Sequence, residues 1–244
     1  KPYEDCQVTI RYSKIHYCHA SADAGGGTIR TNGTTVANLH MYGDTLQYNK
    51  SRDGAGLYWN AHGHNSTKCT IDGCIFRHNF ASHRGGGVML ETSFEFKDDK
   101  TKRQTVVSDN YAASYGGGIV ITGYNGGLIT GGNMEMRLND KLKVTNNKSG
   151  YGGGIGFYFD KMSFTTRTNI NAIIDGCEIS NNTATISGGA ISFRNYSGNR
   201  TDQGHITIGI KMDSGLFENN TAVNYGGALH VENTNIGYTS PQSE

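Results

Sequence analysis

Three aspartates begin similar turn motifs, and two of them stand where they could do chemistry. Asp-Gly or Asp-Ser-Gly occurs at Asp72, Asp175 and Asp213. Cleavage of a glycosidic bond uses two carboxyl groups roughly 5 to 9.5 Å apart, and stacked repeats would place Asp175 and Asp213 about 5 Å apart. An aspartate that opens such a turn usually hydrogen-bonds the backbone instead. We therefore predict no catalytic residue and no enzyme. Asp175 and Asp213 remain the candidates of an alternative, a polysaccharide-cleaving lyase or hydrolase.

A second pattern, His62 with His64, could form half of a metal site, because both imidazoles would lie on one face of a strand. Further ligands could come from Cys69, His78 or His83, but no ligand spacing fixes them. The sequence therefore predicts no metal ion and no cofactor.

Tyr115, Tyr151 and Tyr225 each directly precede a glycine-rich segment. A row of surface tyrosines can stack on sugar rings or contact another protein. A carbohydrate-binding module is therefore a further alternative. The simpler interpretation is that each tyrosine shields a corner of the backbone.

The five cysteines allow few pairings. Cys74 and Cys177 occupy the same repeat position three repeats apart, which places them more than about 10 Å apart and beyond disulfide reach. We predict a Cys6–Cys18 disulfide. Cys69–Cys74 is also possible, and free buried thiols are the alternative for all five.

Eight Asn-x-Ser/Thr motifs point to a secreted glycoprotein. Two of the asparagines, Asn49 and Asn147, belong to a column that should face inward. The candidate glycosylation sites are the other six asparagines: Asn181, Asn219, Asn195, Asn199, Asn32 and Asn65.

These residues are positioned by a glycine-rich corner that recurs seven times at spacings of 29, 31, 31, 36, 36 and 38 residues. The copies begin at Gly25, Gly54, Gly85, Gly116, Gly152, Gly188 and Gly226. Such a period indicates a solenoid or propeller, and a propeller blade needs roughly 40 to 50 residues. The first and third residues after each corner are apolar, except for Thr28 and Arg30 in the first copy. This alternation predicts a strand with one buried face.

A column of asparagines precedes each later corner, three residues after an apolar residue. Its members are Asn49, Asn79, Asn110, Asn147, Asn182 and Asn220. We expect their amides to bond from coil to coil, with His19 at this position in the first coil. Together with the Asp turns, these columns give about three strands per repeat. The sequence thus predicts an all-β parallel β-helix, a solenoid of about seven coils. It forms one domain, 1–244, with an incomplete first coil at 1–20 and a tail at 232–244.

Two segments depart from the plain repeat. An insertion from Glu91 to Gln104 is rich in charge and is expected to be a solvated loop. Met134, Met136 and Leu138 alternate with Glu135 and Arg137, which predicts a half-buried strand.

The paired columns resemble the Phe-x-x-Asn and Gly-Gly-Ala-Ile repeats of the polymorphic outer-membrane protein family. The best match is Phe217–Asn220 with Gly226–Leu229, followed by Ile179–Asn182 with Gly188–Ile191. The resemblance extends over roughly residues 15 to 231. It implies a right-handed β-helix on a cell surface, often with an adhesive role.

The net charge and the lack of long apolar runs exclude some classes of partner. The net charge of +1 makes nucleic acid an unsuitable partner, and no apolar run reaches the ~20 residues of a membrane span. The chain begins at Lys1 without a recognisable signal peptide, which suggests a mature chain or a fragment. We expect an extracellular or cell-surface structural or adhesive β-helix, possible as a building block of a stalk or filament. Its expected partners are a second copy end to end, neighbouring surface proteins, or glycans.

Overall fold

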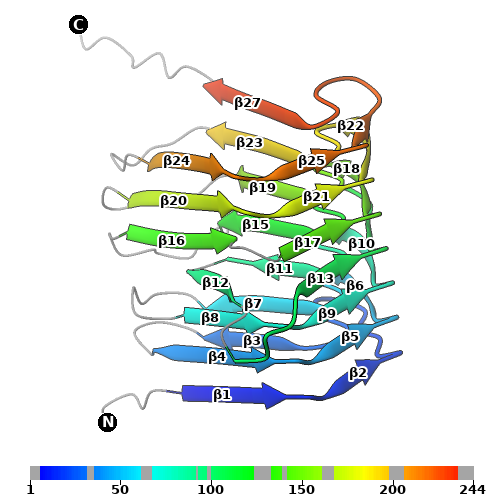
Figure 1. Cartoon of the computed structure of the whole chain (residues 1–244), viewed down its shortest axis with the longest axis vertical. Coiled ribbons are helices and arrows are strands. Elements are labelled where there is room, and N and C mark those ends of the chain that lie inside the picture. Colours follow the sequence, from blue (N-terminus) through cyan, green and yellow to red (C-terminus); the bar gives the residue numbers. More distant parts are fainter. Residues whose placement is uncertain are drawn as a thin grey trace, which may run out of the picture.

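The computed structural model describes residues 6–31, 36–61, 68–91, 93–97, 100–123, 133–138, 142–160, 168–197 and 206–235, and within them every regular element is a β-strand. The strands stack into four parallel sheets, three of seven strands and one of six, as the chain climbs from the N-terminal to the C-terminal end (Figure 1). The parallel β-helix class is therefore confirmed, with seven passes of the chain through three of its sheets.

The four sheets each take one strand from successive coils. The first contains β1 (Cys6–Arg11), β4 (Ala37–Tyr42), β8 (Lys68–Asp72), β12 (Phe94–Lys97), β16 (Asn133–Leu138), β20 (Thr168–Asp175) and β24 (Ile206–Asp213). The second contains β2 (Lys14–His16), β5 (Thr45–Gln47), β9 (Ile75–Arg77), β13 (Thr105–Ser108), β17 (Leu142–Thr145), β21 (Glu178–Ser180) and β25 (Leu216–Glu218). The third contains β6 (Lys50–Asp53), β10 (Phe80–Arg84), β14 (Tyr111–Ala112), β18 (Lys148–Tyr151), β22 (Thr183–Ser187) and β26 (Thr221–Ala222). The fourth contains β3 (Thr28–Thr31), β7 (Leu57–Ala61), β11 (Val88–Leu90), β15 (Ile119–Gly123), β19 (Ile155–Asp160), β23 (Ile191–Ser197) and β27 (Leu229–Asn235).

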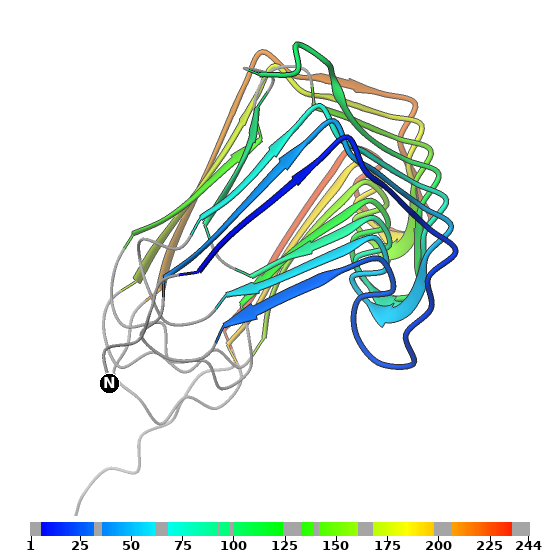
Figure 2. The same cartoon turned by 90° about the horizontal axis from the view of Figure 1, so that it is seen from below.

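The coil is right-handed, as the family resemblance implied. Viewed from the N-terminal end, the chain runs clockwise while it moves away from the viewer (Figure 2). Right-handed connections are the rule for parallel strands, because the twist of each strand favours that sense.

The third sheet corrects the expectation of three strands per repeat. Its strands are as short as the two residues of β14 and lie between the asparagine column and the glycine corner. Segments this short read as a turn in the sequence, yet they pair from coil to coil as a separate sheet.

The glycine corner connects the third sheet to the fourth and needs glycine for two different reasons. Gly116 has a φ of 61°, in the left-handed region that side chains disfavour. A Cβ on Gly117 would lie 2.5 Å from the carbonyl oxygen of Gly153 in the next coil. The corner therefore combines a tight turn with close contact between coils.

The predicted asparagine ladder is present at the corner between the second and third sheets. Asn110 donates from Nδ2 to the Phe76 carbonyl at 2.9 Å and to Asn147 Oδ1 at 3.0 Å. Its backbone N–H also donates to Asn147 Oδ1 at 3.0 Å. In the first coil, however, Cys18 rather than His19 takes the ladder position, since the Cys18 N–H donates to Asn49 Oδ1.

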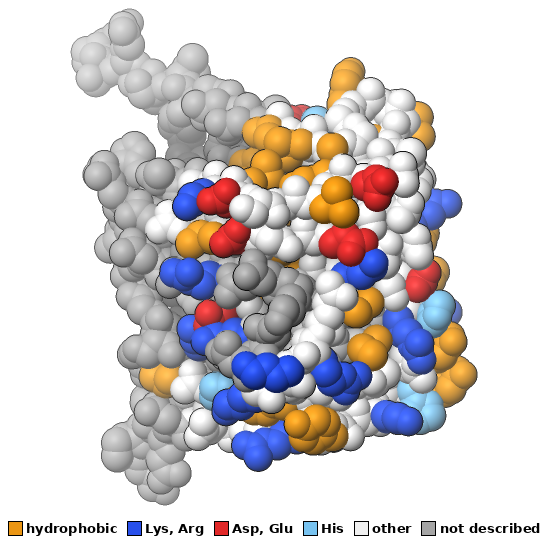
Figure 3. Space-filling view, viewed as in Figure 1, with side chains coloured by type: hydrophobic (Ala, Val, Ile, Leu, Met, Phe, Trp, Pro, Cys, Tyr) orange, Lys and Arg blue, Asp and Glu red, His pale blue; other side chains and the backbone are white. Residues whose placement is uncertain are grey.

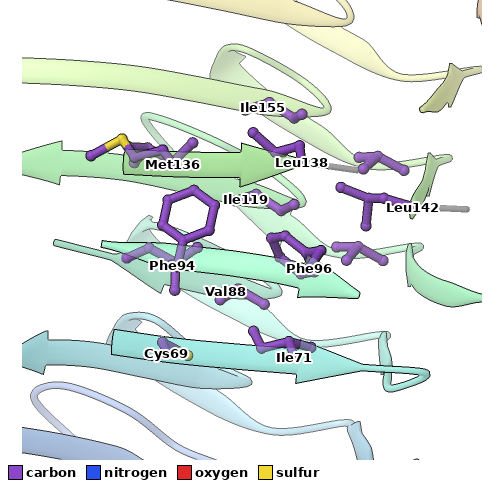
Figure 4. Close-up of a cluster of buried hydrophobic side chains, with 14 of the residues drawn as sticks. Cys69, Ile71, Val88, Phe94, Phe96, Ile119, Met136, Leu138, Leu142 and Ile155 are labelled. Carbon is purple, nitrogen blue, oxygen red and sulfur yellow. The ribbon is translucent and has the colours of Figure 1, made fainter. Parts of the chain in front are cut away.

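Aliphatic and aromatic side chains fill the axis of the coil. Ile119, Ile155 and Ile191 form one interior row through direct pairing of β15, β19 and β23. Met136 and Leu138 face them from β16, as predicted (Figure 4). One core cluster of buried residues runs from Ala37 to Phe193.

β3, the strand after the first glycine corner, breaks the apolar alternation at Thr28 and Arg30 because its register differs by one residue from that of the later strands. Ile29, and not Arg30, pairs with Trp59 and packs against the core. A shift of one residue exchanges the two faces of a strand, so Thr28 and Arg30 point outward. The inward side of β3 is therefore still apolar, although Ile29 stands one position nearer to its glycine corner than its partner Trp59 does.

The ends and the insertion also differ from expectation. β27 continues through Asn235, so the strand extends beyond the start of the tail expected at 232. In the first coil the third sheet is reduced to isolated bridges at His19 and Asp23. The Glu91 to Gln104 insertion is no plain loop, because it contains β12, whose Phe94 and Phe96 are buried in the core (Figure 4).

Candidate functional site

Two rows of side chains line the outside of the corner between the third and fourth sheets, where the chain turns back on itself (Figure 2). The residues of the corner row directly precede the first residue of each corner, which is glycine except for Ala24 in the first coil, and they are joined by parallel pairing: Asp23, Asp53, Arg84, Tyr115, Tyr151, Ser187 and Tyr225. The outer row comes from outward positions of the fourth sheet: Asn60, Glu91, Thr122, Tyr158, Arg194 and Glu232. We call the two rows together the corner strip.

The N-terminal half of the corner strip is ionic. Asp53 accepts hydrogen bonds from Arg84 Nε at 3.0 Å and Nη2 at 3.2 Å, and its Oδ1 lies 3.0 Å from His83 Nδ1. Burial alone would raise the pKa of Asp53, but the hydrogen bonds from His83 and Arg84 and their charges lower it to about 2. Asp53 is therefore ionised at every physiological pH.

Glu91 lies in the same half of the corner strip, but its pKa is raised, whereas that of Asp53 is lowered. It accepts a hydrogen bond of 2.6 Å from the Tyr58 hydroxyl, which in turn accepts one of 2.8 Å from Asn60. Burial raises the pKa of Glu91 to about 7, against the hydrogen bond from Tyr58 and the charge of Arg84. Burial and the neighbouring Glu91 also raise the pKa of the Tyr58 phenol.

Carboxyl groups with pKa values shifted apart are a feature of acid–base catalysis. Here Glu91 is 2% exposed and Asp53 is 4% exposed, so both are sealed from a substrate in this conformation. Neither Asp53 nor Glu91 was predicted from the sequence as a site residue, although Glu91 continues the alternation of the strand Val88–Leu90. What it can do chemically in this state is hold a proton inside the protein near neutral pH.

The C-terminal half of the corner strip is aromatic. The ring of Tyr115 lies 5.2 Å from that of Tyr151 and 4.1 Å from that of Tyr158, in stacked geometry. The guanidinium carbon of Arg194 lies 4.0 Å from the centre of the Tyr151 ring, and Arg194 Nη1 donates to the Tyr115 hydroxyl at 2.9 Å. Stacking of this kind stabilises the strip and holds the tyrosine rings in fixed positions.

A cavity interrupts this aromatic half at Ser187. Serine stands between Tyr151 and Tyr225 in the corner row, so that no ring from the row fills this level. A space of about 520 Å³ remains there, lined by Tyr151, Ile186, Ser187, Arg194, Asn224, Tyr225, His230 and Glu232. Arg194 Nε binds Glu232 Oε2 at 2.8 Å along its wall. This volume falls within the range of small-molecule sites.

The predicted tyrosines therefore take two roles. Tyr115 and Tyr151 shield the corner and stack on each other, in agreement with the simpler interpretation. Tyr225 is 69% exposed and borders the cavity. Arg194, which completes the stack, was not anticipated, because nothing in its spacing marks it as facing Tyr151.

The aspartate candidates lie elsewhere, on the first sheet. Asp175 and Asp213 pair directly at the ends of β20 and β24, so the structure does bring them side by side. Asp213 is exposed, and its Oδ2 lies 3.9 Å from Lys211 Nζ. Asp72 is buried and accepts hydrogen bonds from the Lys100 N–H and from the Thr101 hydroxyl. These donors belong to the next coil, so they are not the local backbone bonds expected of an aspartate that opens a turn.

The remaining predicted sites fare differently. Asn181 and Asn219 are exposed at the corner between the second and third sheets, as predicted. Asn49 and Asn147 are buried in the asparagine ladder, also as predicted. Asn195 belongs to β23. The other predicted sites lie outside the described residues: Asn32, Asn65, Asn199, His62 and His64.

The cysteines are free thiols in the structure. Cys6 begins β1 and Cys18 follows β2, both exposed, and the predicted bond between them is not formed. Cys69, Cys74 and Cys177 are buried in the core, and burial raises the pKa of both Cys69 and Cys74. High pKa values make these thiols unreactive.

Neither a metal-binding cluster nor a membrane-spanning helix occurs among the described residues. No group of three or more His, Cys, Asp or Glu side chains within them could hold a metal ion. No helix long and apolar enough to cross a bilayer occurs in that part of the chain.

Fold and repeat together define a parallel β-helix repeat protein with a ladder of buried asparagines. Residues 176–194 and 214–232 each match the family model described as the Chlamydia polymorphic membrane protein (Chlamydia_PMP) repeat. The matched segments contain the two pairs identified above, Ile179–Asn182 with Gly188–Ile191 and Phe217–Asn220 with Gly226–Leu229, so the recognition of this repeat type is confirmed. No curated protein and no solved structure matches the chain. The family is one of membrane proteins, which supports a surface location indirectly.

Proposed function

We propose that this chain is a non-catalytic extracellular β-helix with a structural and adhesive role, and that it meets its partner through the open, C-terminal half of the corner strip. The observation that carries the proposal is the cavity at Ser187, set among fixed tyrosine rings on a rigid scaffold. Binding residues work best on a support that does not move. The match to a repeat of a membrane-protein family supports the surface setting.

The scaffold suits a stalk. The asparagine ladder joins neighbouring coils by hydrogen bonds that are mostly buried, from Asn49 to Asn220. Each coil adds a further layer to the same core, as in other solenoids. We expect a stack of this kind to be stiff along its axis.

Self-association end to end remains part of the proposal. The last described coil exposes apolar side chains, among them Leu216, Val223 and Val231. On the face shown in Figure 3, Lys and Arg dominate the lower, N-terminal part, whereas Asp and Glu lie mainly over the upper part. Opposite charges toward the two ends of this lateral face favour the approach of a second copy along the axis. Sedimentation over a range of concentrations and salt tests this: a monomer at every concentration would refute it.

The adhesive role is tested with beads that carry the full chain. We expect the beads to adhere to cells or to an extracellular matrix more than beads that carry an unrelated β-helix. Equal adhesion of the two bead types would refute the role.

An enzyme is the second candidate function, supported by the side-by-side placement of Asp175 and Asp213. A screen of neutral and uronic-acid polysaccharides measures it. Turnover that Asp213→Asn abolishes would replace the adhesive proposal by a catalytic one, and turnover that Glu91→Gln abolishes would move the active site to the corner strip.

A further inference from the structure

We propose that the cavity at Ser187 binds one pyranose ring of a neutral sugar. This inference deepens the proposed adhesive role and rests on it, because it names the chemistry of the partner at the same site. Its first support is the shape of the corner row. Tyr115, Tyr151 and Tyr225 each place a ring at their level, whereas Ser187, which is itself only 1% exposed, places none, and the space of about 520 Å³ lies over this level between the neighbouring rings.

The walls of the cavity divide into an apolar and a polar part. Ile186, the exposed ring of Tyr225 and the part of the Tyr151 ring that Tyr115 and Arg194 leave uncovered supply the apolar part. Asn224, His230 and Glu232 supply an amide, an imidazole and a carboxylate, which between them donate and accept hydrogen bonds. A pyranose has matching surfaces, an apolar C–H face for an aromatic ring and hydroxyl groups around its edge.

The charge of the site favours a neutral sugar over an acidic one. Arg194 is the only arginine or lysine on the wall formed by the described residues, and its Nε lies 2.8 Å from Glu232 Oε2. This ion pair cancels the positive charge that would attract a carboxylate or sulfate. His230 approaches the Ser192 hydroxyl at 3.3 Å, which helps to fix its ring beside the cavity.

The same walls argue against an aromatic side chain of a partner protein as the occupant. Such a ring would cover Asn224 and Glu232 and offer them at most one hydroxyl or N–H group, whereas a pyranose carries several hydroxyl groups. Burying polar groups without partners costs free energy, whereas sugar hydroxyls satisfy them.

Binding is measured on the full chain by saturation-transfer NMR and calorimetry with the methyl pyranosides of glucose, galactose, mannose and N-acetylglucosamine. We expect at least one of them to bind, with a Kd on the order of 1 mM. Ser187→Tyr should weaken this binding by at least about tenfold, because the new ring fills the cavity. Tyr225→Leu should weaken it by about tenfold through loss of the ring face, and Tyr225→Phe should not.

Tyr48→Ala is the matched control, since Tyr48 is an exposed, stacked tyrosine at a different corner. It should leave the Kd unchanged, and circular dichroism checks that each variant is folded. If Ser187→Tyr does not fold, Tyr225→Leu and Glu232→Gln, both on the cavity rim, carry the test. Absence of binding by all four pyranosides overturns the inference, as does unchanged binding by the folded variants. Binding of N-acetyl-tyrosinamide in place of the sugars also overturns it. In each of these cases adhesion of the wild-type beads would still leave the adhesive role standing.

Discussion

The two halves of the corner strip have the same backbone and opposite character. Around Asp53, Arg84 and Glu91 the strip is filled with ionisable side chains, and its two carboxyl groups, Asp53 and Glu91, are closed to solvent. Around Ser187 it is built of rings and opens into a cavity. In a repeat protein the scaffold is thus uniform while each coil can carry a different surface. A binding site can arise wherever one side chain of a row is small.

The largest expected effect compares the arginines of the two halves. Arg84→Met removes two of the hydrogen bonds that Asp53 accepts, while the Asp53 side chain stays 5% exposed and keeps His83 and Arg52 as neighbours. We expect it to lower the free energy of unfolding by about 2 to 3 kcal/mol. Arg194→Met leaves Glu232, whose side chain is 33% exposed, so that about 1 kcal/mol is expected. Urea unfolding measures both, and equal losses would contradict the division into a sealed and an open half.

The next effect concerns pH. The pKa of Glu91 is raised to about 7 in the folded chain, from 4.5, so the protonated carboxyl stabilises the fold below about pH 4.5 and this stabilisation is lost as the pH rises through 7. For Asp53 the pKa is lowered to about 2 from 3.8, so its stabilisation is present above 3.8 and lost as the pH falls through 2. Stability should therefore be highest near pH 4 to 5 as far as these two groups decide it.

Glu91→Gln isolates this effect, because the amide oxygen can still accept the Tyr58 hydrogen bond. The wild type should lose on the order of 2 kcal/mol between pH 4.5 and 7.5 that the variant does not lose. Thermal unfolding across that range measures the difference. Parallel pH profiles for the two proteins would show that Glu91 is not held protonated.

The smallest expected effect exchanges the side chains of the open half. Tyr151→Ser removes the stack with Tyr115 and Arg194 and should cost about 1 to 2 kcal/mol. Ser187→Tyr adds a ring to the row and should leave stability within about 1 kcal/mol of wild type. A marked loss of stability in Ser187→Tyr, measured by thermal unfolding, would mean that the space at Ser187 cannot take a ring.

Much of the fold could be predicted from the sequence, since solenoid contacts repeat at a fixed period. The interior row of Ile119, Ile155 and Ile191 and the ladder through Asn110 and Asn147 follow directly from aligned columns. The first coil could not be aligned in this way, because a slip of one residue brings Ile29 inward and puts Cys18 in the ladder position. The short third sheet was missed because β14 has only two residues, too few to show a period.

The candidate site could be predicted only in part. The tyrosines before the glycine corners were visible as a column, and Tyr225 does border the cavity. Arg194 and Glu91 were not visible, because their roles depend on contacts between the corner row and the outer row. Glu91 contacts Tyr58 of the preceding coil, and Arg194 reaches back to Tyr115 two coils away. Each of these pairs joins two different columns of the aligned repeats, so neither pair can be found by reading one column.

Bead adhesion with matched variants tests the central claim most directly, namely that the open end of the corner strip is where the chain meets its partner. Beads are coated with equal amounts of folded wild type, Ser187→Tyr or Tyr48→Ala and applied to the same cells or matrix. The account predicts strong adhesion of wild type and Tyr48→Ala and a loss of about tenfold for Ser187→Tyr. Undiminished adhesion of Ser187→Tyr would contradict it and place the contact on another face of the coil.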